Sequence, residues 1–152
     1  MQKLLSYLSF QGRANRQRYW LTALSIFGLL VVSAMFVGLL AIAPLLSLII
    51  IPFWLALLVA GLANGARRLH DRGKSAWWLI LFLVMPMLLS IPSELAKYSS
   101  SADFQAFGAS LALVGLPFSI WGLVVMGFLK GTAGPNRFGD DPLQPAVQEV
   151  FA

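Results

Sequence analysis

Side chains that could bind or transform a charged group are concentrated in three short stretches of the chain, which we call the arginine-rich stretches. The first two hold three arginines each, and the third holds one arginine and one lysine. These stretches cover residues 10–20, 67–75 and 130–142. Guanidinium groups form paired, charge-assisted hydrogen bonds with phosphate oxygens, and a lysine ammonium binds phosphate as a compact charge. The pattern therefore predicts a site for a small anion or a lipid headgroup, with the candidate binding residues Arg13, Arg16, Arg67, Arg68, Arg72, Lys74 and Arg137.

His70 and Asp71 are neighbours in the second stretch and suggest an acid–base pair. Consecutive residues of a helix point about 100° apart, so adjacency alone does not bring the two side chains together. A lone histidine at a helix end more often interacts with the helix dipole. We therefore predict a polar site at His70 and assign no catalytic residue. With no cysteine and one histidine, the chain is also predicted to hold no metal and no cofactor.

The third stretch, residues 130–142, contains several glycines and prolines, which favours a defined series of turns. Its acidic side chains would then project from a rigid loop toward the arginines of the other two stretches. We predict that this loop is a structural latch whose carboxylates pair with those arginines, and that the acid of the second stretch bridges arginines of two stretches. The latch residues are Asp71, Asn136, Asp140 and Asp141.

Long segments without any charged residue separate the three stretches and must position them. No Asp, Glu, Lys, Arg or His occurs in residues 19–66, 75–93 or 104–129, and the whole chain is 59% hydrophobic and 11% charged. A helix needs about 20 apolar residues to cross the hydrocarbon core of a bilayer. We predict one all-α membrane domain over residues 1–152, a four-helix bundle with spans near 19–41, 45–66, 76–91 and 109–129, a short cytoplasmic arm, a rigid middle loop and a cytoplasmic tail.

The distribution of lysine and arginine predicts the orientation of this bundle. With four spans, ten of the eleven cationic residues lie on the face that holds both termini and the middle loop, and only Lys97 lies on the other face. This asymmetry follows the positive-inside rule and places both termini in the cytoplasm. Because topology accounts for the net charge of +5, we predict no nucleic-acid partner.

Two tryptophans, Trp54 and Trp121, fall near the middle of predicted spans. The hydrocarbon core offers no water to an indole N–H, so we expect both rings to face the bundle interior and both N–H groups to find an acceptor.

The three stretches together resemble a known family. The patterns Phe-x-Gly-Arg-x-x-Arg-x-x-Tyr-Trp, Arg-Arg-Leu-His-Asp-Arg-Gly-Lys-Ser-x-Trp-Trp and Lys-Gly-Thr-x-Gly-x-Asn-Arg-Phe-Gly-x-Asp-Pro are similar to those of the bacterial inner-membrane family catalogued as domain of unknown function 805. The departures are mild, with Ala76 in place of glycine and Phe138 in place of tyrosine. The resemblance implies a multi-pass protein of the bacterial inner membrane, and it implies no particular activity or cofactor.

Two classes of function fit these observations. The favoured one is a non-enzymatic membrane module whose basic cytoplasmic surface binds an anionic headgroup, a small anion or a partner protein; membrane lipids are the expected partners. The alternative is a membrane enzyme that acts on a phosphorylated or lipid substrate at that surface. A coupled transporter is disfavoured because no charged residue lies inside a span. Gly61 and Gly65 could bring two helices close together, within one chain, in a homo-oligomer or against another membrane protein.

Overall fold

The computed structural model describes residues 7–37 and 43–144, and within these ranges the chain is all-α. Three helices are long and apolar enough to cross a membrane, and the apolar helix Ile80–Ala96 is shorter. The predicted all-α membrane fold is thus confirmed. The elements are α2 (Arg16–Ala34), the 3-10 turn η2 (Pro44–Leu46), α3 (Ser47–Asp71), the π-helical turn η3 (Ile80–Val84), α4 (Met85–Ala96), α5 (Ala102–Leu123) and the π-helical turn η4 (Val124–Phe128).

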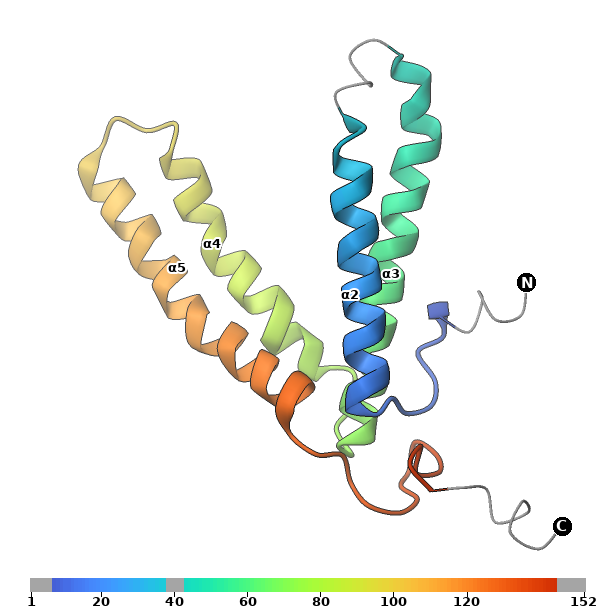
Figure 1. Ribbon diagram of the computed structural model, residues 1–152. Helices are drawn as coiled ribbons and strands as arrows, with labels where there is room; N and C mark the ends of the chain where they lie inside the picture. The colour runs from blue at the N-terminus through green and yellow to red at the C-terminus, as the bar shows by residue number, and fades with distance from the viewer. Residues whose placement is uncertain (1–6, 38–42, 145–152) are drawn as a thin grey trace, which may run out of the picture.

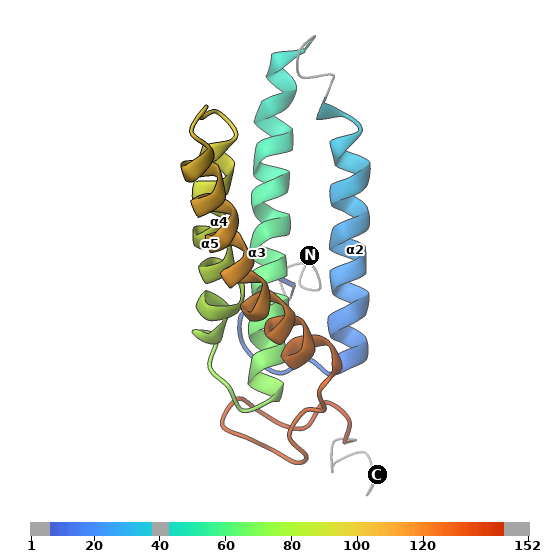
Figure 2. The same ribbon diagram turned by 90° about the vertical axis from the view of Figure 1, so that its left-hand side faces the viewer.

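The four helices form two hairpins that meet at one end of the molecule and diverge toward the other (Figure 1). One hairpin consists of α2 and α3, and the other of α4 and α5 with their π-helical turns. The view from the side of the second hairpin shows the end of α5 beside the start of α2 (Figure 2), and η4 is the part of the second hairpin that contacts both α2 and α3. We call this shared end the junction. The helices therefore splay from the junction instead of packing as a closed bundle.

Local sequence signals set the ends of the helices. Asn15 caps the start of α2, where its side-chain oxygen accepts the N–H of Arg18 at 2.8 Å. At the end of α3, Gly73 adopts a left-handed conformation with φ of +67°. Its N–H donates to the carbonyl of His70, and the next N–H, of Lys74, donates to Leu69, both at 2.9 Å. This pair of bonds is a Schellman cap, so α3 stops at a fixed place and the chain turns at once into the second hairpin.

The second hairpin is held together by glycines at a spacing of seven residues. Gly108, Gly115 and Gly122 are buried on one face of α5. A Cβ atom added to Gly108 would lie 2.8 Å from the backbone of Ser93, and one added to Gly122 would lie 2.7 Å from the Cβ of Phe82. Only glycine lets the two helices approach this closely, and the apolar side chains on either side then face outward.

The buried apolar core lies at the junction, where both hairpins contribute to it. Its buried members are Ala66, Leu69, Leu79, Phe82, Val125 and Met126. Away from the junction, most apolar side chains of the helices are exposed, as is appropriate for a surface that contacts lipid. The helices are therefore anchored to one another where the charged stretches lie.

Several helix bounds differ from the predicted spans. The third helix continues to Ala96, and the connection before Ala102 is correspondingly shorter than the segment expected between the last two spans. The end of the first predicted span, at residues 38–41, lies outside the described residues. Of the predicted small-residue pair, Gly65 packs against Leu79, whereas nothing lies within 4 Å of a Cβ added to Gly61.

The two tryptophans differ in their surroundings. The indole N–H of Trp54 donates to the hydroxyl of Ser33 at 2.9 Å, which confirms the predicted acceptor, but the residue is 37% exposed, so its ring does not lie wholly in the interior. Trp121 packs edge-on against Phe82, with ring centroids 5.4 Å apart, but its N–H has no acceptor in the part of the chain that the structure describes. Trp121 is 47% exposed, so only one side of its ring faces the interior, and the prediction that its N–H finds an acceptor is wrong for the described residues.

Candidate functional site

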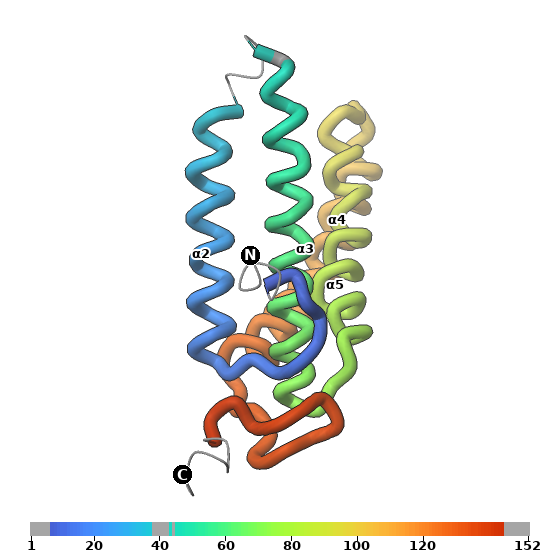
Figure 3. Tube along the Cα trace, turned by 90° about the vertical axis from the view of Figure 1, so that its right-hand side faces the viewer, coloured from blue at the N-terminus to red at the C-terminus, as the bar shows by residue number. Residues whose placement is uncertain are grey.

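The three arginine-rich stretches meet at the junction. The arm before α2 crosses the end of α3, and the tail after η4 turns beneath both (Figure 3). Asp71 lies where they meet, and its side chain is 4% exposed. One carboxylate oxygen pairs with Arg13 at 3.0 Å, and the other pairs with Arg68. The carboxylate of the second stretch therefore bridges arginines of two stretches. We call Arg13, Arg68 and Asp71 the arginine cluster.

Arg13 also ties the tail to this cluster through backbone carbonyls. One terminal nitrogen donates to the carbonyl of Gly134 at 2.6 Å, and the other donates to that of Thr132 at 2.6 Å. A longer bond reaches the carbonyl of Gly139 at 3.3 Å. The side chain of Arg13 is 1% exposed, so these bonds and the ion pair together compensate a charge that has lost its water.

Arg68 has no exposed surface and joins the two hairpins. Its Nε donates to the carbonyl of Met126 at 2.7 Å, and a terminal nitrogen donates to the carbonyl of Leu129. These carbonyls belong to the C-terminal end of the α5–η4 helix, where carbonyl groups lack helical partners and carry partial negative charge. Arg68 thus donates the hydrogen bonds that these carbonyls lack, and its positive charge offsets their partial negative charge.

The two carbonyls between these acceptors are also occupied. The indole N–H of Trp20 donates to Gly127 at 3.0 Å, and Arg16 donates to Phe128 at 3.2 Å. Four consecutive carbonyls at the end of the second hairpin are therefore hydrogen-bonded to side chains of the first hairpin. These bonds hold the two hairpins together at the junction.

The tail docks on the end of α3 mainly through its backbone and amide groups. The N–H of Thr132 donates to the carbonyl of Asp71 at 2.8 Å, and the side-chain amide of Asn136 donates to the carbonyl of His70 at 3.0 Å. The side chain of Arg137 donates a third such bond, to the carbonyl of Gly73 at 3.1 Å. The tail is thus fixed along the last turn of α3.

The tail carboxylates do not play the part predicted for them. Asp141 accepts the backbone N–H groups of Gly134 at 2.9 Å and Leu143 at 3.0 Å, and forms no ion pair within the described ranges. These two bonds lower the pKa of Asp141, Leu143 contributing more than Gly134. Asp140 is exposed, with no hydrogen bond or ion pair to any described residue. The predicted pairing of these carboxylates with arginines is therefore wrong. The arginines donate instead to backbone carbonyls, which every residue carries and which no sequence pattern reveals.

His70 is held by the chain on both sides. Its Nδ1 lies 3.2 Å from the carbonyl of Gly12, and its ring stacks on Phe138 with centroids 3.9 Å apart and planes 5° from parallel. The neighbouring carboxylate of Asp71 is already shared by two arginines. His70 therefore links the arm to the tail, and the pair does not form an acid–base couple.

The predicted binding residues divide into buried and accessible groups. Arg13 and Arg68 belong to the cluster, and Arg67 is 5% exposed with its Nε bonded to the carbonyl of Ala63. The others reach the surface. Arg16 and Arg137 are exposed, Arg72 and Lys74 are half-buried, and Lys74 lies 3.9 Å above the ring of Trp78; Lys130 and Arg18, which were not on the predicted list, are also exposed.

Comparison with known proteins agrees with this architecture. Residues 7–140 match the family described as "Protein of unknown function (DUF805)", a range that covers the first two stretches and the third as far as residue 140. The chain belongs to the DUF805 family. It is 31% identical over 143 residues to inner membrane protein YhaI of Escherichia coli K12, covering 91% of this chain and 90% of YhaI. Inner membrane protein YhaH of the same strain is 28% identical over 161 residues, with 93% and 94% covered. The uncharacterized protein YiiR is 33% identical over 135 residues, with 88% and 85% covered. No solved structure matches the chain.

The DUF805 chain has contacts at the junction that the sequence patterns did not reveal. Phe138 supplies the stacking partner of His70, and Trp20 supplies a donor to the end of η4. Gly131 lies against the arginine cluster, where an added Cβ would sit 2.0 Å from a carboxylate oxygen of Asp71. The only sequence signal for these roles is that all three residues fall inside the arginine-rich stretches.

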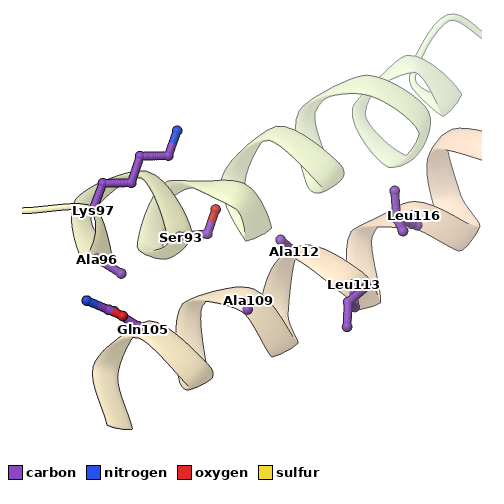
Figure 4. Close-up of a pocket in the computed structure, with 8 residues that line it drawn as sticks. All are labelled: Ser93, Ala96, Lys97, Gln105, Ala109, Ala112, Leu113 and Leu116. Carbon is purple, nitrogen blue, oxygen red and sulfur yellow. The ribbon is translucent and has the colours of Figure 1, made fainter. Parts of the chain in front are cut away.

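A wide cavity of about 730 Å³ lies at the opposite end of the molecule, between α4 and α5 (Figure 4). Small residues such as Ala109 and Ala112 line it, and its one charged residue, Lys97, points away from α5 and pairs with Glu94 at 2.6 Å. This cavity has little capacity for charged chemistry. The polar groups that could bind a ligand are at the junction.

Proposed function

We propose that this DUF805 chain is a non-enzymatic membrane module whose basic cytoplasmic surface binds the anionic headgroups of membrane lipids. The observation that carries the proposal is an excess of exposed positive charge at the junction. Arg16, Lys130 and Arg137 are exposed there, and none of them pairs with a carboxylate in the described chain. The headgroup phosphate of an anionic lipid would supply the missing negative charge.

The acidic residues of the junction are too few to neutralise this surface. Asp71 is shared between two buried arginines, Asp141 is bonded to backbone N–H groups, and the exposed Asp140 is one negative charge beside the exposed cations Arg16, Lys130 and Arg137. Cations close to an anionic leaflet each contribute about 1 kcal/mol to binding at physiological ionic strength. The exposed cations together therefore favour contact with anionic lipid over contact with zwitterionic lipid.

The orientation of the chain is part of the same proposal. We place the junction on the cytoplasmic side, with four helices crossing the inner membrane, because lysine and arginine are concentrated in the segments at that end. The Ile80–Ala96 helix is about 26 Å long at a rise of about 1.5 Å per residue, slightly less than the thickness of a bilayer core of about 30 Å. Local thinning of the bilayer supports a helix of this length.

The enzyme alternative has no comparable support. It requires His70 or a nearby acid to exchange protons with a substrate held at the same place. The ring of His70 is covered by Phe138, and the carboxylate of Asp71 is consumed by ion pairs. A small anion or a partner protein could use the same exposed cations, so the test must compare lipids directly.

The test uses the tryptophans already present near the junction, Trp20, Trp77 and Trp78. The full-length protein is reconstituted in mixtures of phosphatidylcholine and phosphatidylglycerol in which one of the two lipids is brominated, and bromine quenches tryptophan fluorescence on contact. We expect phosphatidylglycerol to associate several-fold more strongly than phosphatidylcholine, with a preference that falls as salt rises, because exposed charges are screened. Equal quenching by the two lipids at low salt would overturn the proposed function.

A further inference from the structure

We propose that the junction contains one defined phospholipid site, in which the phosphate of an anionic phospholipid lies between the start of α2 and residues 130–133 and its glycerol and acyl portion lies along Trp20 and Phe128. This inference rests on the proposed function and specifies where on the basic surface a lipid is held.

The phosphate part of the site is a polar cavity of about 320 Å³. Arg16 and Lys130 bring positive charge to its wall, and Thr132 adds a polar side chain. Asp71 and Asp141 also line it, and so does Arg68, which pairs with Asp71. Three cationic residues thus face two carboxylates in the lining, and an anion of the size of a phosphate group would compensate the excess positive charge.

The two cations at this cavity are available for a ligand. Arg16 uses one terminal nitrogen for the carbonyl of Phe128 and leaves its other donors without an acceptor among the described residues. The ammonium of Lys130 contacts no acceptor or carboxylate in the described chain. Two such donors in the lining of one cavity can bind a phosphate through charge-assisted hydrogen bonds.

A second cavity, of about 480 Å³, adjoins the first and shares Asn15, Arg16 and Leu143 with it. Its wall is formed by Trp20 and Phe128, whose rings meet edge-on with centroids 5.8 Å apart. The hydrogen bond from Trp20 to Gly127 fixes this wall in position. The ring also lies directly against the backbone of Gly127, where an added Cβ would be 2.7 Å away from it. A groove with an aromatic wall that shares lining residues with a cationic cavity matches a molecule with a phosphate at one end and hydrocarbon at the other.

This adjacency favours a lipid over free phosphate. Free phosphate would use only the polar cavity, whereas a phospholipid fills both and gains the contact area of the aromatic wall. Tryptophan is also common at the level of lipid headgroups, where its ring is in apolar surroundings and its N–H is hydrogen-bonded. The position of Trp20 in the first turns of α2 fits that level.

The experiment measures the binding of dioleoylphosphatidylglycerol and dioleoylphosphatidylcholine to the full-length protein in neutral detergent by native mass spectrometry. The site variant carries Arg16→Gln and Lys130→Gln. The matched control carries Lys74→Gln and Arg137→Gln, which removes the same charge from the junction outside both cavities. We expect the phosphatidylglycerol that binds first to bind about tenfold or more weakly to the site variant, and the control to lose less than about threefold, because only the site variant loses the charge-assisted bonds to the phosphate.

The possible outcomes separate this inference from the proposed function. If both variants lose the same affinity, the defined site is wrong while general binding to the basic surface stands. If the wild type does not prefer phosphatidylglycerol over phosphatidylcholine, the proposed function itself fails. If glycerol phosphate displaces the lipid at an equal concentration, the acyl part of the site is wrong. Lys130→Gln alone is tested as well, because its ammonium makes no contact whose loss could unfold the described chain, and we expect a loss of at least about threefold.

Discussion

At the scale of single residues, the junction is organised around a carboxylate that two arginines share. Asp71, Arg13 and Arg68 are all buried, and the two cations would repel each other without the acid between them. The remaining donors of both arginines are directed to backbone carbonyls of the tail and of η4. Burial of these charges is sustained because almost every donor has an acceptor.

Gly131 tests how tightly the tail is fitted to this group. Because an added Cβ would lie 2.0 Å from an oxygen of Asp71 that Arg68 already holds, Gly131→Ala should destabilise the protein by about 1–3 kcal/mol. Gly61→Ala is the control, since nothing lies within 4 Å of its added methyl group. Reversible unfolding of the purified protein in mixed detergent micelles measures both. Equal stability of the two variants would show that the tail does not contact Asp71 as described.

Asp141 gives the tail a dependence on pH. Its pKa is lowered by the N–H groups of Leu143 and Gly134, so its carboxylate stabilises the turn above the ordinary carboxyl pKa of about 4, and this contribution is lost as pH falls through the lowered value. We expect the amide resonances of Gly134 and Leu143 to titrate with a midpoint below that ordinary value. Asp141→Asn should abolish the titration, and Asp140→Asn should leave it unchanged. A midpoint at or above the ordinary value in the wild type would contradict this assignment.

At the scale of elements, the two hairpins are built differently. The hairpin of α4 and α5 depends on glycines that bring backbones together, whereas α2 and α3 contact each other less, and a Cβ added to Gly28 or Gly61 would meet nothing within 4 Å. The distribution of charge-free segments in residues 19–66, 75–93 and 104–129 was sufficient to predict four helices, because a bilayer core requires that length of apolar chain. It could not predict the divergence of the hairpins, because lipid-facing and protein-facing residues are equally apolar.

Gly108 is the position at which the close approach in the second hairpin can be tested. Gly108→Ala would place a methyl group 2.8 Å from the backbone of Ser93, which cannot move independently of α4. We expect a loss of about 1–3 kcal/mol in the same unfolding assay. Gly28→Ala in α2 has open space around it and should be neutral or slightly stabilising. If Gly108→Ala were as stable as Gly28→Ala, the glycine contact would not hold this hairpin together.

The prediction of the site from the sequence had similar limits. A scarcity of acids among many arginines was enough to predict that Asp71 bridges two stretches. The acceptors of the other arginine nitrogens are carbonyls such as those of Met126 and Thr132, and these became available only because a helix ends and the tail turns at those places. The role of Asp141 was wrongly predicted for the same reason, since its partners are backbone N–H groups created by the turn.

At the scale of the whole molecule, the chain has one charged end and one end that is nearly free of charge. The junction carries the three arginine-rich stretches, and the opposite end, around the loop between α4 and α5, carries only the charged residues Glu94, Lys97 and Asp103 among the described residues, the first two as an ion pair. Membrane orientation and headgroup binding would both follow from this polarity. The buried arginines join the segments, and the exposed cations remain for the lipid.

The orientation can be measured directly because the chain has no cysteine. Single cysteines are introduced as Gln11→Cys in the arm and Ser100→Cys in the loop before α5, and intact cells with a permeable outer membrane are treated with a membrane-impermeant maleimide. We expect Ser100→Cys to react in these cells and Gln11→Cys to react only after the inner membrane is opened. Labelling of Gln11→Cys in intact cells would place the junction outside the cytoplasm.

The most direct test of the account is a double-mutant cycle between Arg13 and Asp71, because this contact joins the arm to the end of α3 at the place where the tail docks. The free energy of unfolding is measured in mixed micelles for the wild type, Arg13→Gln, Asp71→Asn and the double variant. We predict that Asp71→Asn is strongly destabilising, by about 3–5 kcal/mol, because it leaves two buried arginines uncompensated. The coupling energy between the two positions should be about 1–3 kcal/mol. Additivity within about 0.5 kcal/mol would contradict the claim that Arg13 of the first stretch and Asp71 of the second interact in one buried cluster.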